Sequence, residues 1–196
     1  MDGEIVPGDY DAMMKFLLGV IQRYGVEVGK IKTVVSLDSP GGSIIEAEKM
    51  ADLIFESHQA TAVIEGHKCV SACFLLFAAG NPRSVASDAF VGVHSVSEQQ
   101  SETMRSAAMT VIMSRNLAKR GLPPDIIGRL VQTPPYQVYR LTIADLLAMK
   151  VQIMGSRVAA IPRSPTMPAY QPPPLRSTSH RLWFCRSRGI GQAAGT

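Results

Sequence analysis

The 196-residue sequence lacks several signatures that would settle its class at once. No apolar run approaches the roughly 18 residues of a membrane-spanning helix. The start, MDGEIVPGDYD, has no basic region followed by an apolar one, as a secretory signal would have. There is no GxxxxGK[ST] phosphate loop, no RNA-binding motif and no internal repeat. We therefore expect no transmembrane segment, and a cytoplasmic location as the chain stands. A periplasmic location is the alternative if a segment before Met1 is missing.

Cysteine is also scarce. The chain has three cysteines and no zinc-type CxxC pair. Two of them, Cys69 and Cys73, lie on either side of Ser71 in the run GHKCVSACFLLFAAG. We interpret all three as reduced thiols in a cytosolic setting.

Residues 155–196 contain no Asp, Glu or Lys, but they hold six arginines and six of the 13 prolines. The net charge of +4 therefore comes from this segment, since residues 1–154 carry 14 basic and 16 acidic side chains. Such a composition cannot order a core, so we predict a domain over 1–154 and a Pro/Arg-rich disordered tail over 155–196. A basic tail that touches nucleic acid or an acidic membrane is the alternative. We expect no nucleic-acid partner.

Strand-like and helix-like patterns alternate along residues 1–154. Runs rich in β-branched residues at 31–39, 61–66 and 91–95 predict strands. Apolar residues at helical spacing predict helices at 9–25, 43–57, 69–80, 101–119, 125–132 and 141–151, with Asp9 and Thr142 as caps. The 69–80 run is apolar almost all round, so as a helix it must be buried. The alternation predicts an α/β fold with a largely parallel sheet.

Three places along the chain offer the parts of an acyl-transfer site. Ser71 precedes the apolar helix and is either a nucleophile or an ordinary helix cap. Gly42, in the SPGG motif, has an N–H group that a sharp turn can aim at an oxyanion, although the motif alone also fits a plain turn. His94 ends the strand VGVHS and is either a base or a core polar group.

In combination these motifs are more specific than each is alone. The segments LDSPGGSIIEAEKMADLI, HKCVSACFLLFAAGNPR and VGVHSVS, in this order, resemble the Clp protease proteolytic subunit of the ClpP/crotonase-like superfamily. They are most similar to bacterial Clp-like proteins that are often predicted to be periplasmic. The resemblance covers residues 3–151 and implies a fold of stacked βαβ units with a mainly parallel sheet and surrounding helices.

The resemblance also implies a function, that of a serine-type peptidase. Ser71 matches the nucleophile, His94 the general base, and the N–H groups of Gly42 and Ala72 the oxyanion hole. It implies a peptide or protein substrate, no cofactor or metal, and a homo-oligomer, because members of the family form rings or trimers.

If the chain is such a peptidase, we expect Cys69 and Cys73 to be small apolar side chains that pack behind the turn that carries Ser71. A C-x-x-x-C disulfide is an alternative. So is a thiol nucleophile beside Lys68.

The sequence departs from the family at the third catalytic residue. Val138 aligns with the family's aspartate, and neither Asp125 nor Asp145 falls at that position. Another group, such as Tyr139 or a backbone carbonyl, would then have to orient the imidazole. The alternative function is a catalytically weak or inactive assembly or binding module.

Two further departures concern partners. SVSEQQSETM follows His94, where the family has a glycine-rich strand that binds peptides. Met1 falls within the first strand of the resemblance, which leaves no room for axial loops, so we expect no docking to an ATPase ring. A crotonase-type acyl-CoA enzyme is a third hypothesis, but it gives no reason for a serine and a histidine at these spacings.

Overall fold

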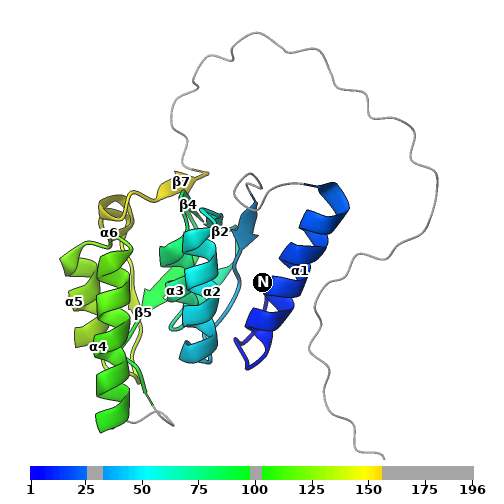
Figure 1. Cartoon of the computed structure of the whole chain (residues 1–196). Coiled ribbons are helices and arrows are strands. Elements are labelled where there is room, and N and C mark those ends of the chain that lie inside the picture. Colours follow the sequence, from blue (N-terminus) through cyan, green and yellow to red (C-terminus); the bar gives the residue numbers. More distant parts are fainter. Residues whose placement is uncertain (26–32, 98–102, 156–196) are drawn as a thin grey trace, which may run out of the picture. The chain divides into compact units, whose positions relative to one another are not determined.

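Two small β-sheets form the centre of the fold (Figure 1). The first is parallel throughout, with the strand order β1 (Val34–Ser36), β2 (Ala60–Val63), β4 (Arg83–Ala86) and β7 (Gln152–Met154). The second contains β3 (Lys68–Val70), β5 (Phe90–Val93) and β6 (Tyr139–Arg140), with β3 and β5 parallel and β6 antiparallel to β5. The predicted α/β class with a mainly parallel sheet is therefore confirmed.

This computed structural model describes residues 1–25, 33–97 and 103–155. All of them belong to a compact unit that spans Met1–Ser156. A second unit, Arg157–Thr196, lies outside the described residues, and so does nearly all of the disordered tail predicted for 155–196.

Six helices surround the sheets in the described ranges (Figure 1). They are α1 (Asp9–Tyr24), α2 (Ile44–Glu56), α3 (Cys73–Ala79), α4 (Met104–Lys119), α5 (Pro124–Gln132) and α6 (Ile143–Ala148). Every residue of α3 is buried, as its apolar run predicts. Thr142 caps α6 as predicted, because its hydroxyl accepts from the N–H of Asp145. The predicted cap of α1 is wrong, since Gly8 occupies the cap position and Asp9 is the first helical residue.

Glu46 of α2 attaches the start of α1 to the rest of the fold. None of the α1 residues, all of which are described, is buried. The Oε2 of Glu46 accepts hydrogen bonds from the N–H groups of Gly8 and Tyr10, both at 3.2 Å, and Lys49 pairs with Oε1 at 2.9 Å. The hydrogen bond from Lys49, with those from Tyr10 and Gly8, holds the pKa of the Glu46 carboxyl below its ordinary value, against the opposing effect of burial.

This lowered pKa gives a stability that depends on pH. A carboxyl with a lowered pKa in the folded state stabilises the fold above its ordinary pKa, and the contribution is lost as the pH falls through the folded-state value. We expect Glu46→Gln to lower the free energy of unfolding at pH 7, with a difference from wild type that shrinks toward zero in acid. Urea unfolding at several pH values measures it, with Glu65→Gln as an exposed control. A difference that persists unchanged in acid would contradict a role for the charge.

Candidate active site

The three sequence motifs meet at one end of the second sheet. The segment that contains SPGG joins β3 through a parallel bridge between Ser39 and Cys69. On its other side β3 pairs in parallel with β5, with Val70 opposite Gly92. Ser71 comes directly after β3, and His94 comes directly after β5. Because the carboxyl ends of parallel strands lie at the same edge of a sheet, these residues and the SPGG turn are neighbours.

Ser71 occupies a tight turn between β3 and α3. Its φ is 58°, in the left-handed region that a residue with a side chain rarely adopts. Its N–H donates to Gly92 O at 3.2 Å, and its carbonyl accepts from Phe74 N at 2.9 Å. The cap position of α3 belongs to Ala72, and no side chain caps this helix. The half-buried Ser71 hydroxyl is therefore not used as a helix cap, and such strained backbone is common at active sites.

Glycine is required at position 41 because the SPGG turn lies directly against Ser71. Gly41 is buried with φ of 106°, and a Cβ there would lie 2.6 Å from Ser71 Cβ and 2.8 Å from Val70 O. The hydroxyl of Ser39 closes the turn by accepting from Gly41 N at 3.1 Å. The sequence motif identified the turn, but this close approach is visible only in the structure.

The backbone of the next residue, Gly42, is oriented toward β3. On the side away from β3, Ile5 N donates to Gly41 O and Ser43 N donates to Ile5 O, both at 2.8 Å. In the trans peptide between Gly41 and Gly42 the C=O and N–H point in opposite directions, so with Gly41 O directed at Ile5 the N–H of Gly42 points away from Ile5. Among the described residues, the N–H groups of Gly42 and Ala72 have no hydrogen-bond partner. The two residues predicted to form the oxyanion hole therefore carry donors that remain available.

His94 has a defined hydrogen bond at one ring nitrogen. Its Nδ1 lies 2.7 Å from the carbonyl oxygen of Ser95, and the side chain is half-buried. A carbonyl can only accept, so Nδ1 donates, and in the neutral imidazole Nε2 is then free to accept a proton. Within the described part of the chain, no hydrogen bond joins the Ser71 hydroxyl to His94. In apo enzymes such a contact commonly tightens only when substrate binds.

Val138, which the sequence resemblance aligns with an aspartate, directly precedes β6, and His94 directly follows β5. The register of β5 and β6 pairs Gly92 with Arg140 and Val93 with Tyr139, so His94 and Val138 adjoin the last pair of this ladder. A Cβ on Gly92 would lie 2.5 Å from Val138 Cγ1, which places Val138 on the face of β5 that carries His94. Its side chain cannot accept a hydrogen bond from the imidazole.

Tyr139 and Asp145 form a separate unit around the start of α6. The Tyr139 hydroxyl donates to Asp145 Oδ2 at 3.0 Å, and the pKa of Tyr139 is raised by burial and by this bond. Burial would raise the pKa of Asp145, but hydrogen bonds from Thr142 and Tyr139, together with the charge of Arg129, outweigh it and leave that pKa lowered. Of the two orienting groups that the sequence left open, the backbone carbonyl is the one that contacts His94.

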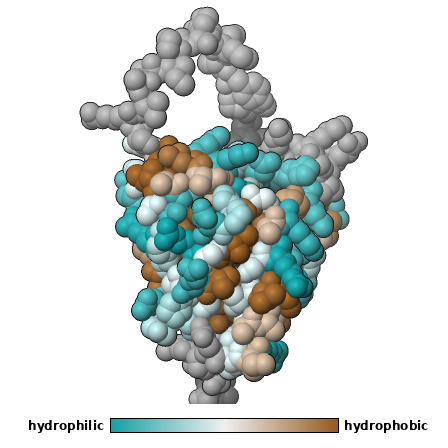
Figure 2. Space-filling view, turned by 90° about the vertical axis from the view of Figure 1, so that its left-hand side faces the viewer, coloured by the Kyte–Doolittle hydropathy of each residue, from teal (hydrophilic) through white to brown (hydrophobic). Residues whose placement is uncertain are grey.

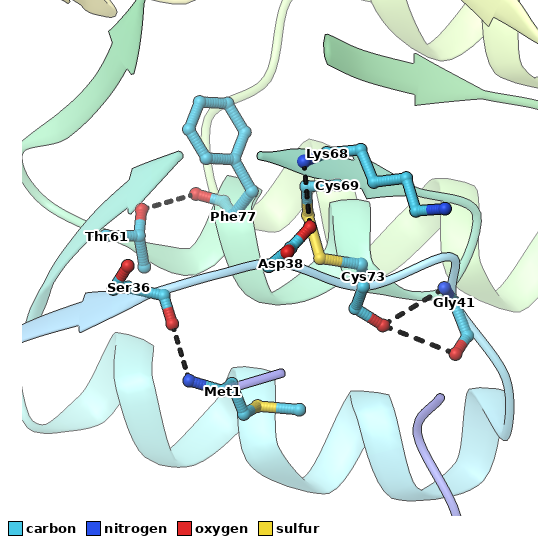
Figure 3. The surroundings of a disulfide bond; sticks show 10 residues. Met1, Ser36, Asp38, Gly41, Thr61, Lys68, Cys69, Cys73 and Phe77 are labelled. Carbon is cyan, nitrogen blue, oxygen red and sulfur yellow. Dashed lines mark hydrogen bonds between the residues drawn. A yellow bond between two sulfur atoms is a disulfide. The ribbon is translucent and has the colours of Figure 1, made fainter. Parts of the chain in front are cut away.

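The prediction that Cys69 and Cys73 are reduced thiols is wrong. They form a disulfide, drawn in Figure 3, with their Cα atoms 5.2 Å apart. The end of β3 and the first residue of α3 bring the two Cα atoms within the range that a disulfide spans. Both residues are fully buried, and with both sulfurs bonded the thiol-nucleophile alternative is also excluded.

The described ranges contain neither a cluster of metal-ligating side chains nor a helix that could span a membrane. No group of three or more His, Cys, Asp or Glu side chains in them is placed to hold a metal ion. None of the helices described is long and apolar enough to cross a bilayer.

The arrangement of strands and helices is that of a ClpP-like fold. The structure is similar to the 1510-N membrane-bound stomatin-specific protease, solved as a point mutant, with a TM-score of 0.58, 16% identity and coverage of 78% of this chain and 76% of that one. It is also similar to a point mutant of ClpP1 from Listeria monocytogenes, with a TM-score of 0.58, 16% identity and coverage of 80% and 90%. No protein-family model and no curated protein matches the sequence. At this identity the similarity establishes the fold.

Proposed function

We propose that the protein is a serine-type peptidase with its centre at Ser71 and His94. The observation that carries the proposal is the pair of available N–H groups, of Gly42 and Ala72, in the two segments that meet at a serine in a strained turn. Of the two similar solved structures, one is named as a stomatin-specific protease and the other as ClpP1.

The residues have distinct roles in the proposed reaction. The Ser71 hydroxyl attacks the peptide carbonyl while Nε2 of His94 takes its proton. The N–H groups of Gly42 and Ala72 stabilise the oxyanion of the tetrahedral intermediate. His94 then gives the proton to the leaving amine, and a water molecule hydrolyses the acyl-enzyme by the same route. Throughout, the Ser95 carbonyl holds the imidazole with Nδ1 as the donor.

An active-site probe tests this proposal. A fluorophosphonate reacts with activated serines, so we expect it to label wild-type protein once per chain and to leave Ser71→Ala unlabelled. Ser114→Ala is the matched control, because this hydroxyl only donates to Thr110 O within α4. Equal labelling of wild type and Ser71→Ala would contradict the proposal.

The second candidate function is a catalytically inactive assembly or binding module. Two observations favour it: Val138 in place of an acid, and no hydrogen bond between Ser71 and His94 within the described residues. A folded wild-type protein that the probe leaves unlabelled would support this candidate.

The disulfide bears on location. Disulfides persist in oxidising compartments and are rare in the cytosol. The bond between Cys69 and Cys73 therefore favours the periplasmic alternative over the cytoplasmic prediction, which rested in part on reduced thiols.

Exposed apolar residues support the predicted homo-oligomer. Figure 2 views the side of the molecule that carries α4, α5 and α6, and it shows several apolar patches among polar surface. Exposed residues on these helices include Val131, Ile143 and Leu147. On α1, Phe16 is 66% exposed. Surfaces of this kind are common where chains of one protein associate. The substrate and the absence of an ATPase partner stay predictions.

A further inference from the structure

We propose that the Cys69–Cys73 disulfide is a positioning element of the acyl-transfer site, so that the peptidase is competent only when this bond is formed. This inference rests on the proposed function, because it concerns the same serine. The disulfide connects Cys69 of β3, before Ser71, with Cys73, the first residue of α3, after it (Figure 3).

Both ends of the disulfide are attached to rigid parts of the fold. Cys69 lies on β3, where it pairs with Val91 of β5 on one side and is bridged to Ser39 on the other. Cys73 begins α3, which is buried over its whole length. The bond therefore fixes the distance between two supports that cannot easily move, and only residues 70–72 lie between them.

Those intervening residues carry the proposed chemistry. Ser71 holds its left-handed φ, and Ala72 supplies one of the two available N–H groups. Apart from the disulfide, two backbone hydrogen bonds hold Ser71. Its N–H donates to Gly92 O, and its carbonyl accepts from Phe74 N. Without the disulfide, a relaxation of Ser71 to negative φ would move its hydroxyl and turn the adjacent peptide, which bears the Ala72 N–H.

A purely stabilising role explains the bond less well. A disulfide stabilises mainly by restricting the unfolded chain, and this effect is smallest for short loops. Only four positions separate Cys69 from Cys73. The main effect of the disulfide is therefore on the conformation of the turn between the two cysteines.

Forming the bond is a two-electron oxidation. The two thiols lose two protons and two electrons as the S–S bond forms, and an exchanging disulfide of a protein or small molecule accepts them and becomes a dithiol. Because both sulfurs are fully buried, exchange requires a state in which α3 has not yet packed or has opened.

The experiment compares the oxidised and reduced forms of the full chain. Cys185→Ser serves as the background, so that Cys69 and Cys73 are the only cysteines left. The protein is reduced with a phosphine in denaturant, refolded in the same reductant, and compared with an oxidised sample taken through the same steps. Two quantities are measured: the second-order rate constant for fluorophosphonate labelling of Ser71, and amide hydrogen exchange at residues 71–74.

We expect reduction to lower the labelling rate constant by about 10²-fold, the loss typical of a misplaced reacting group. Exchange at residues 71–74 should become faster while α2 keeps its protection, and re-oxidation should restore both values. The double variant Cys69→Ser/Cys73→Ser should behave like the reduced protein.

The possible outcomes separate this inference from the proposed function. Equal labelling and equal exchange in the two forms would overturn the inference, and so would a loss of protection across the whole fold. If neither form is labelled, the proposed function fails, and the exchange data still decide whether the disulfide holds the turn.

Discussion

We expect His94→Gln to lower the turnover of a peptide substrate by about 10²- to 10⁴-fold, the range that a positioned general base contributes. His94 follows β5, directly beside the turn that carries Ser71. Its Nδ1 donates to Ser95 O at 2.7 Å, which leaves Nε2 as the acceptor for the serine proton. A glutamine side chain can keep a hydrogen bond in this place but cannot take up the proton.

A second histidine offers a matched control. Nδ1 of His58 also contacts a backbone carbonyl, that of Phe55, at 3.1 Å, and this exposed residue follows α2 rather than β5. His58→Gln should therefore turn over peptide at the wild-type rate. Fluorogenic peptide hydrolysis and the thermal midpoint are measured together for both variants. A His94→Gln protein that is folded and as active as His58→Gln would remove His94 from the mechanism.

Local patterns predicted several of the elements that position the site. The 69–80 run has almost no polar face, and α3 is buried over its whole length for that reason. The turn at the SPGG motif also follows from the sequence, because glycine and proline restrict the backbone locally. The predicted helix over 69–80 is wrong at its start, since residues 68–70 form β3 and the helix begins only at Cys73. Since parallel strands direct their carboxyl ends to one edge, the proximity of the SPGG turn, Ser71 and His94 was predictable once the strands were.

Features that depend on three-dimensional approach were not predictable in the same way. The disulfide requires a Cα separation that the 69–73 spacing allows but does not impose, since a continuous helix or strand over these residues would place the sulfurs differently. Likewise, the contact between His94 and the Ser95 carbonyl depends on a side-chain rotamer. The apolar residues at helical spacing in 9–25 include Phe16, yet Phe16 is 66% exposed, because among the described elements α2 is the one that packs closely against α1.

The largest gain in activity should come from restoring the missing acid. We expect Val138→Asp to raise kcat by about 10- to 10³-fold with little change in KM, since a histidine in the wrong tautomer or without its carboxylate can lose about 10⁴-fold in turnover. Residues 94 and 138 adjoin the last pair of the β5–β6 ladder, Val93 with Tyr139, and Val138 lies on the face of β5 that carries His94. A carboxylate there would replace the neutral Ser95 carbonyl as acceptor for Nδ1 and would stabilise the imidazolium that forms as Ser71 attacks.

The position tolerates a charge, because the Val138 side chain is 45% exposed and an aspartate there would keep contact with water. Val138→Asn is the control, since it matches the aspartate in shape and offers a carbonyl oxygen but no negative charge. A gain shared equally by both variants would assign the effect to shape or hydrogen bonding. A folded Val138→Asp protein with unchanged or lower kcat would mean that the imidazole is already held by Ser95, or that turnover is limited outside the Ser71–His94 pair.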